Sequence, residues 1–272
     1  MAKPAAMSVH IGVNQLDKKH YAGWDGKLVS CGFDAADMAA IAKSRGIKHH
    51  TLATREATRA NVLAAIRAAA RQTPSGGSFL LTFSGHGGQV QDVNGDEMDA
   101  KDETWCLYDG QLIDDELHFE LRRFPEGARI LVIADCAACG TVERTFAPDP
   151  DPPPAGQRSK LLPYLIAERT SVIHEKFYSE IQRKVPRSLA DSDSGPAIVL
   201  ISACQVNQTA IDGKDNGAFT ARLRQVWNEG SFDGCLAKFH AVITAGMPST
   251  QSPGLRAIGP ATDFLAQPPF RP

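Results

Sequence analysis

Ser78-Phe79-Leu80-Leu81-Thr82-Phe83 runs directly into Ser84-Gly85-His86-Gly87-Gly88, and this stretch decides the fold. The first six residues form an apolar, aromatic run of strand length. The glycines that follow leave room around the His86 ring and offer backbone N–H groups that no side chain blocks. An isolated histidine is more often structural than catalytic. A buried strand that ends in small residues around one histidine instead favours a catalytic imidazole at a sheet edge.

A second strand-length run ends in a comparable way. Residues 129–134 are apolar and lead into Asp135-Cys136-Ala137-Ala138-Cys139-Gly140-Thr141. In open α/β sheets, functional residues gather at the carboxyl ends of the strands. We therefore expect His86 and the turn around residue 137 to face each other.

These motifs resemble those of caspase-like cysteine peptidases, closest to the metacaspases and their bacterial relatives. That family carries Ser-Gly-His-Gly after one strand and Asp-Ser-Cys-His-Ser-Gly after a later one, which places Ala137 at the nucleophilic cysteine. His86 and Ala137 are 51 positions apart, and caspases show about 50. Ser30-Cys31-Gly32-Phe33-Asp34-Ala35 and the segments 201–210 and 217–220 resemble further family signatures. The resemblance runs from about residue 7 to residue 260.

The resemblance implies a caspase-like α/β fold, a three-layer sandwich with a mostly parallel sheet and helices on both faces. The alternation of helical and strand-length segments along the chain favours the same architecture. We expect strands at residues 8–13, 47–52, 78–83, 129–134 and 197–202, with an edge strand at 254–258. We expect helices at residues 33–45, 58–71, 114–123, within 164–184, and at 217–229.

The chain reads as one caspase domain in three parts. Residues 1–147 resemble a large subunit, residues 148–195 form a Pro-rich and then basic linker, and residues 196–272 resemble a small subunit. The prolines of residues 148–154 exclude helix and interior strand and indicate a stiff, extended segment. Proteases cut such exposed segments, so we expect a zymogen activated by a cut in this linker, made by itself or by an upstream protease. The candidate cleavage sites are Arg158, Arg169, Arg183 and Arg187.

The chemistry that the resemblance implies is acyl transfer. A cysteine at the nucleophile position 137 would attack the peptide carbonyl, and His86 would act as general base and then protonate the leaving amine. The N–H groups of Gly87 and residue 137 would form the oxyanion hole.

Ala137 itself has no nucleophile, and three explanations stay open. The cysteine has been replaced to give an inactive form, or the chain is a natural pseudoprotease with a binding or regulatory role, or Cys136 or Cys139 has taken over. We favour the first, because the other parts of the site are present. Cys136-Ala137-Ala138-Cys139 is also formally a CxxC redox motif, but a thiol oxidoreductase would leave the His86 motif unexplained.

The resemblance also assigns a substrate pocket. Asp34, Ser84 and Asp135 would line the primary pocket, and two carboxylates there favour Arg or Lys before the scissile bond. The expected partners are therefore proteins or peptides with a basic residue at that position.

Residues 91–115 are rich in acid and allow two interpretations. One is a solvated acidic loop. The other is calcium binding, which the resemblance to metacaspases implies for Asp102, Asp114 and Asp115. No other cofactor is expected to be required.

Composition narrows the class of protein. A formal net charge of −2 offers no broad basic surface for nucleic acid. The six cysteines do not look like a small disulfide scaffold. No apolar run approaches membrane-spanning length, and the N-terminus does not read as a signal peptide. We therefore expect a cytoplasmic protein without a membrane partner, and by analogy with bacterial caspase relatives a role in regulated cell death or defence.

Overall fold

The central feature of the fold is a six-stranded, mostly parallel sheet. The structure is a computed structural model that describes residues 6–92, 101–137, 153, 155–185, 194–205 and 208–272. The strands, in spatial order, are β11 (Gly254–Ile258), β9 (Ala197–Ser202), β7 (Arg129–Asp135), β3 (Ser78–Ser84), β1 (Ala6–Gly12) and β2 (Lys48–Ala53). Only the β11–β9 pairing among these is antiparallel. The inner strands carry continuous apolar runs because both of their faces are covered.

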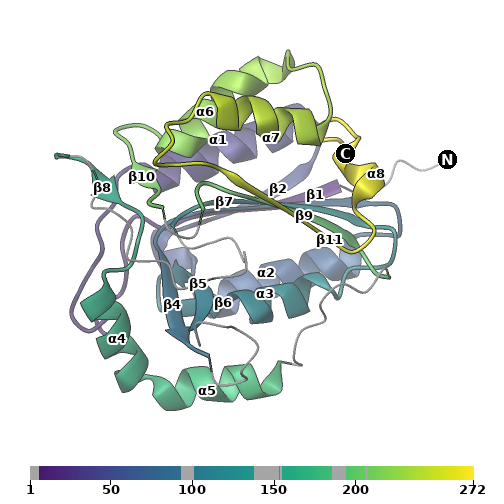
Figure 1. Ribbon diagram of the computed structural model, residues 1–272. Coiled ribbons are helices and arrows are strands. Elements are labelled where there is room, and N and C mark those ends of the chain that lie inside the picture. The colour runs from purple at the N-terminus through teal and green to yellow at the C-terminus, as the bar shows by residue number, and fades with distance from the viewer. Residues whose placement is uncertain (1–5, 93–100, 138–152, 154, 186–193, 206–207) are drawn as a thin grey trace.

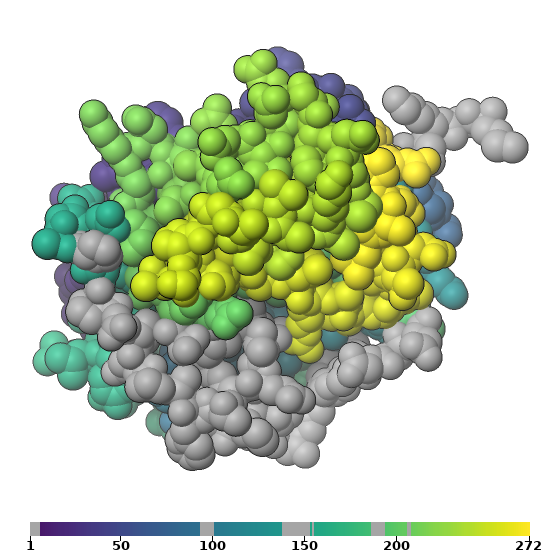
Figure 2. Space-filling model, turned by 45° about the horizontal axis from the view of Figure 1, so that its top comes forward, coloured from purple at the N-terminus to yellow at the C-terminus, as the bar shows by residue number. Residues whose placement is uncertain are grey.

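Helices cover both faces of this sheet (Figure 1). One layer contains α1 (Cys31–Ser44), α6 (Ala218–Trp227) and α7 (Leu236–Ala245), and the other contains α2 (Arg59–Gln72) and α3 (Asp114–Leu121). Side chains of β3 alternate between the layers: Phe79, Leu81 and Phe83 pack with α2, whereas Leu80 packs with α1 and α6. The predicted three-layer α/β architecture is therefore confirmed. The C-terminal residues, green to yellow in Figure 2, form one continuous surface on their side of the molecule.

The predicted strands and helices of both layers are confirmed within a few residues, whereas α7 (Leu236–Ala245) and the short α8 (Thr262–Leu265) were missed. Thr58 caps α2, since its hydroxyl accepts a hydrogen bond from the Asn61 amide at 3.2 Å. The helix α7 was not predicted. Three short helical elements lie elsewhere along the chain: η1 (Thr54–Glu56), η2 (Asn228–Gly230) and α8 (Thr262–Leu265).

The acidic region contains a small antiparallel sheet of β4 (Gly87–Gln91), β5 (Lys101–Leu107) and β6 (Gly110–Ile113). The solvated-loop interpretation is wrong for β5, in which Asp102 is 1% exposed and Glu103 is 5% exposed. The strand is buried because Trp105 stacks on Phe83 at a centroid distance of 4.7 Å, which joins the small sheet to the main core.

Part of the expected linker is folded onto the body of the protein. Residues 148–152 and 154 lie outside the described residues, but β8 (Arg158–Ser159) pairs antiparallel with β10 (Ile211–Asp212). The predicted helical segment forms two helices, α4 (Tyr164–Ile173) and α5 (Glu175–Lys184). At their junction the His174 ring stacks on His20 at 3.9 Å, and the Tyr178 hydroxyl lies 2.6 Å from His20 Nε2. Within the described ranges, no helix combines the length and apolar character needed to cross a bilayer.

Candidate active site

The site lies at the carboxyl ends of β3 and β7. Ser84 and Asp135 are the last residues of these two strands, and parallel pairing places them directly side by side. Asp34 reaches the same place from the first turn of α1, the helix that follows β1. The sheet topology therefore brings together the three residues that the sequence assigned to the substrate pocket, and we call them the acidic pocket.

Asp34 is almost fully buried, and each of its oxygens has partners. Its Oδ1 accepts hydrogen bonds from the Gly217 amide and from Asn216 Nδ2, both at 3.0 Å. Its Oδ2 accepts from the Ser84 hydroxyl at 2.7 Å. Hydrogen bonds of this kind to a charged carboxylate offset part of the cost of its burial.

Asp135 is held by the start of α6. Its Oδ2 accepts hydrogen bonds from the Thr220 amide at 3.2 Å and the Thr220 hydroxyl at 2.6 Å. A helix N-terminus favours nearby negative charge. Gly217 at this helix start has a steric role, because a Cβ there would overlap both Asp135 and Lys160. The amino end of α6 thus closes the acidic pocket on one side.

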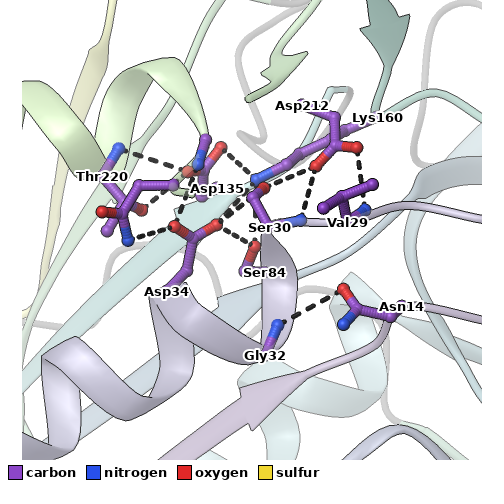
Figure 3. Close-up of polar contacts among 12 residues, drawn as sticks. Asn14, Val29, Ser30, Gly32, Asp34, Ser84, Asp135, Lys160, Asp212 and Thr220 are labelled. Atoms are coloured by element: carbon purple, nitrogen blue, oxygen red, sulfur yellow. Dashed lines mark hydrogen bonds and ion pairs between the residues drawn. The ribbon is translucent and has the colours of Figure 1, made fainter. Parts of the chain in front are cut away.

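The cation that faces these carboxylates is Lys160, whose side chain is fully buried (Figure 3). Its Nζ lies 3.0 Å from Asp34 Oδ2, 3.1 Å from Asp135 Oδ1 and 3.0 Å from the Ser84 hydroxyl. The three residues predicted to receive a basic side chain therefore hold one from the chain's own linker. Sequence reasoning missed Lys160, because its partner Asp34 lies 126 positions away and no local pattern points to the contact.

The charges in this cluster are mutually dependent. Burial alone would lower the pKa of Lys160, but attraction to Asp135 and Asp34 outweighs it and raises that pKa above its usual value. Burial raises the pKa of Asp135, while Lys160 and the hydrogen bond from Thr220 oppose the shift. Lys160 is therefore charged at neutral pH, and it is the main group that opposes the rise of the Asp135 pKa.

The backbone of Lys160 is bound as closely as its side chain. The Lys160 carbonyl oxygen accepts hydrogen bonds from the Gly87 amide at 2.9 Å and the Ala137 amide at 3.1 Å. The Lys160 amide donates to the Ala210 carbonyl at 2.8 Å, and the Leu162 amide donates to the Gly87 carbonyl at 2.7 Å. The two amides assigned to the oxyanion hole thus converge on one peptide oxygen.

His86 lies in the turn between β3 and β4 and is buried. Its Nε2 is 2.8 Å from the Gly26 carbonyl, and the Trp24 ring packs beside it at a centroid distance of 4.8 Å. Burial lowers the pKa of His86 to about 4, so the ring is neutral at pH 7. A carbonyl can only accept, so the single ring proton is on Nε2 and Nδ1 holds a lone pair. Among the described residues no group meets full hydrogen-bond geometry with Nδ1, although the Leu161 backbone lies close enough to oppose the lowering of the His86 pKa. A neutral ring with a free lone pair is the form that a general base requires.

Gly26 is required for this arrangement. Its φ is +51°, a left-handed conformation that favours glycine. A Cβ at this position would come within 3.0 Å of His86 Nε2. The carbonyl that orients the His86 ring therefore depends on a residue without a side chain.

Residue 137 lies two positions after the end of β7 and presents its amide, but no thiol, to the site. Ala137 is fully buried. Neighbouring Cys136 is disulfide-bonded, and Cys139 lies outside the described residues. Cys31 is buried beside the acidic pocket, and burial raises its pKa to about 12, which leaves it protonated and unreactive.

Asp212 of β10 is a further site residue that sequence reasoning missed. Its carboxylate accepts hydrogen bonds from the amides of Val29 and Ser30, each at 2.9 Å, and from the Ser30 hydroxyl at 2.5 Å. Figure 3 shows these contacts with Val29 and Ser30. Its negative charge acts against the lowering of the His86 pKa. Asp212 thus fixes the loop before α1 and connects β10 to the site.

The residues assigned to calcium are near one another but apart from this site. Asp102 lies on β5, and Asp114 and Asp115 begin α3. Burial and the charges of Glu103, Asp115 and Asp102 raise the pKa of Asp114 well above its usual value. Within the part of the chain that the structure describes, no three His, Cys, Asp or Glu side chains have metal-ligand geometry. Calcium binding stays a prediction.

The four arginines predicted as cleavage sites lie in different settings. Arg158 is exposed on β8, Arg169 lies within α4, and Arg183 lies within α5. Arg187 is outside the described residues. The structure brings none of the three described arginines to the acidic pocket, which Lys160 fills.

Comparison with known proteins agrees with this geometry. The family model described as the caspase domain matches residues 16–263. A solved structure, protein GSU0716 from Geobacter sulfurreducens, is 45% identical with a TM-score of 0.87 over 98% of both chains. Caspase-1 from Spodoptera frugiperda has a TM-score of 0.53 over 96% of this chain and 88% of its own, and at 10% identity it supports the fold alone.

Curated metacaspases match shorter stretches. Metacaspase-1 of Mycosarcoma maydis is 34% identical over 145 residues, which are 48% of this chain and 35% of that protein. Metacaspase-1 of Saccharomyces cerevisiae (strain YJM789) is 25% identical over 175 residues, which are 62% of this chain and 37% of that protein. The matched stretches thus span little more than a third of these relatives. Because the caspase-domain model covers nearly the whole chain, the chain belongs to the caspase family of cysteine peptidases.

Proposed function

We propose that this chain is built as a cysteine endopeptidase that cleaves after Arg or Lys. We also propose that Ala137 leaves it able to hold the basic residue but not to cut the bond. The observation that carries the proposal is the Lys160 ammonium, fully buried between Asp34 and Asp135. A charge is tolerated at such depth only when it is paired and hydrogen-bonded. The same pocket would repel an acidic residue before the scissile bond.

The remaining groups support acyl transfer once a thiol is present. His86 offers an unprotonated Nδ1, which would accept the thiol proton and later pass it to the leaving amine. The amides of Gly87 and residue 137 already donate to one carbonyl oxygen. In the tetrahedral intermediate the same two donors would stabilise the negative charge on that oxygen.

The test is the Ala137→Cys variant with fluorogenic peptides that end in Arg, Lys, Ala or Asp. We expect hydrolysis of the Arg and Lys peptides only, and its loss in Ala137→Cys/His86→Ala. Assays with and without calcium would include the metal predicted for Asp102, Asp114 and Asp115. A thermal melt matched to that of the parent chain verifies the fold.

The second candidate function is a pseudoprotease that binds basic segments without turnover, and Ala137 is the observation that favours it. It predicts that Ala137→Cys folds normally and hydrolyses none of the four peptides. That result would contradict the peptidase proposal.

A further inference from the structure

Residues 158–162, Arg-Ser-Lys-Leu-Leu, lie across the site in the way that a protease holds its substrate. We infer that this segment is an internal substrate, with the Lys160–Leu161 bond in the cleavage position, and that it plugs the site while residue 137 is Ala. The segment also defines the substrate class, a basic residue followed by two bulky aliphatic residues. The inference rests on the proposed function. It adds the identity of the scissile bond and the residues that the site recognises before and after that bond.

The side chain of Lys160 fills the acidic pocket. Its ammonium contacts Asp34, Asp135 and Ser84 together. Beside these residues only about 10 Å³ of open cavity remains, roughly the least that holds one water molecule. A second basic side chain cannot enter while Lys160 is in place.

The backbone contacts distinguish a bound substrate from an ordinary buried ion pair. A structural lysine needs partners at Nζ, and its buried carbonyl could accept a hydrogen bond from any nearby donor. Here the carbonyl of the same residue also receives two hydrogen bonds, from Gly87 and from Ala137 at the nucleophile position. This carbonyl belongs to the Lys160–Leu161 peptide bond, so a thiol at residue 137 would be next to its carbon.

Residues before Lys160 are held as an added strand. Ser159 pairs with Ile211 and Arg158 pairs with Asp212 in an antiparallel ladder. The Lys160 amide extends the pairing to the Ala210 carbonyl at 2.8 Å. Strand addition binds an extended peptide through its backbone, so side-chain selection is left to the pockets.

Residues after the bond are held by apolar contacts. The Leu162 amide donates to the Gly87 carbonyl at 2.7 Å, and its side chain is 3% exposed within the core cluster under the sheet. The partly buried Leu161 packs against the core cluster on the other face. Both positions would accept aliphatic side chains and disfavour charged ones, because burial of an unpaired charge is costly.

The chemical step follows from these contacts. In Ala137→Cys, the sulfur would bond to the Lys160 carbonyl carbon while His86 Nδ1 takes the thiol proton. The C–N bond to Leu161 then breaks, and His86 returns the proton to the Leu161 nitrogen. Water hydrolyses the thioester, which releases the Lys160 carboxylate and restores the thiol.

The experiment is mass spectrometry and N-terminal sequencing of full-length Ala137→Cys, purified with and without calcium. We expect a new N-terminus at Leu161.

Variants of Lys160 test the charge requirement. Ala137→Cys/Lys160→Arg should be cut at the same bond. Ala137→Cys/Lys160→Gln should be cut at least about 100-fold more slowly, because a site built for a charged donor rejects its neutral analogue. The matched control is Ala137→Cys/Arg169→Gln, which removes an exposed basic residue of the same segment and should leave the cut unchanged.

The side-chain preference after the bond is tested in trans with the cleaved enzyme. A quenched peptide containing Arg-Ser-Lys-Leu-Leu should be hydrolysed at least about 10-fold faster than one containing Arg-Ser-Lys-Asp-Asp. Equal rates would overturn the proposed preference.

The plug is tested on the parent chain by amine acetylation. Lys160 should stay unmodified under conditions that acetylate the exposed Lys176, and equal labelling would overturn the plug. If Ala137→Cys hydrolyses basic peptides yet stays uncut, or is cut only elsewhere, the internal-substrate inference fails while the proposed function stands. A folded Ala137→Cys protein that hydrolyses neither basic peptides nor itself would overturn both.

Discussion

At the scale of single residues, the site is organised by three buried charges. Asp34 and Asp135 are each at most 2% exposed, and Lys160 is fully buried between them. Removal of one partner from such a cluster leaves an uncompensated buried charge, which is more damaging than the loss of a surface ion pair. Substitutions in the acidic pocket should therefore act on both specificity and stability.

Asp135→Asn in the Ala137→Cys enzyme should reduce selectivity for basic substrates. The amide keeps the shape of the side chain but offers no charge to the ammonium, which costs about 3 kcal/mol, on the order of 100-fold in kcat/KM. The measurement compares kcat/KM for a Lys-ending and an Ala-ending peptide. An equal loss on both would mean that Asp135 acts only in folding.

His10 gives a prediction about acid stability. Its ring lies 2.9 Å from the hydroxyls of both Thr82 and Ser8, and burial, with repulsion from His49, lowers its pKa to about 3. In the unfolded chain a histidine has a pKa of about 6.5. Below that pH the unfolded state binds the proton more readily, so stability is present at neutral pH and lost as the pH falls towards 3.

His10→Gln should flatten this pH dependence. The histidine accounts for a loss of about 2 kcal/mol between pH 7.5 and pH 5, and the glutamine cannot titrate. Urea unfolding at a series of pH values measures the difference between the two proteins. His86 and His20 are shifted in the same direction, so the parent curve should be steeper than His10 alone predicts. Parallel curves for parent and variant would contradict the assignment.

At the scale of elements, the start of α6 holds the carboxylates of the acidic pocket in place through hydrogen bonds. Thr220→Val keeps the shape of the side chain but removes the hydroxyl that donates to Asp135 at 2.6 Å. We expect the free energy of unfolding to fall by about 1–3 kcal/mol, because a buried carboxylate loses a donor. Thr220→Ser retains the hydroxyl and is the matched control. Denaturant unfolding of the three proteins should place the serine variant nearer the parent.

The elements also show how far the sequence could predict the fold and the site. The strands β3, β7 and β9 were predictable because both of their faces are buried and their apolar runs are continuous. The expectation that His86 and the turn around residue 137 face each other followed from the ends of those strands. The pocket role of Asp135 and the oxyanion role of the residue 137 amide came only from the resemblance to caspase-like peptidases. The helix α7 was overlooked although Leu236, Phe239 and Ile243 form a buried stripe at helical spacing.

The role of Lys160 could not be predicted from the sequence, for a physical reason. It is one basic residue among several in its segment, and its contact with Ser84 spans 76 positions. A buried ion pair across such a distance depends on tertiary structure rather than local pattern. The burial of β5 was missed for a similar reason. Its acidic residues indicate a solvated segment, and only the tertiary contact between Trp105 and Phe83 shows that the strand is buried.

At the scale of the whole molecule, one sheet joins the parts of the chain on either side of Lys160. Strand β9 follows that residue and pairs in parallel with β7, which precedes it, and α6 from the later part holds Asp34 and Asp135. A chain cut after Lys160 should therefore stay associated. The two fragments of Ala137→Cys should co-elute in size-exclusion chromatography and separate only in denaturant, whereas separation under native conditions would contradict the shared sheet.

Calcium should act on the molecule through the acidic cluster near β5 and α3. If Asp102, Asp114 and Asp115 bind the ion in the folded state, the melting temperature should rise with calcium concentration by mass action. The raised pKa of Asp114 should fall when a cation is bound, because a nearby positive charge favours the ionised form. Asp114→Asn should weaken the response. A flat melting temperature up to millimolar calcium, or an equal effect of magnesium, would exclude a specific calcium site.

The pairing of Asp34 and Asp135 around one ammonium has a consequence for the way the site opens. When Lys160 leaves, Asp135 loses the cation that most opposes the rise of its pKa on burial, while the neighbouring charge of Asp34 still raises that pKa. The vacated pair should take up a proton from solvent, so that opening is coupled to protonation. Mild acid would then favour the open pocket, and an arriving basic side chain would expel the proton as it binds.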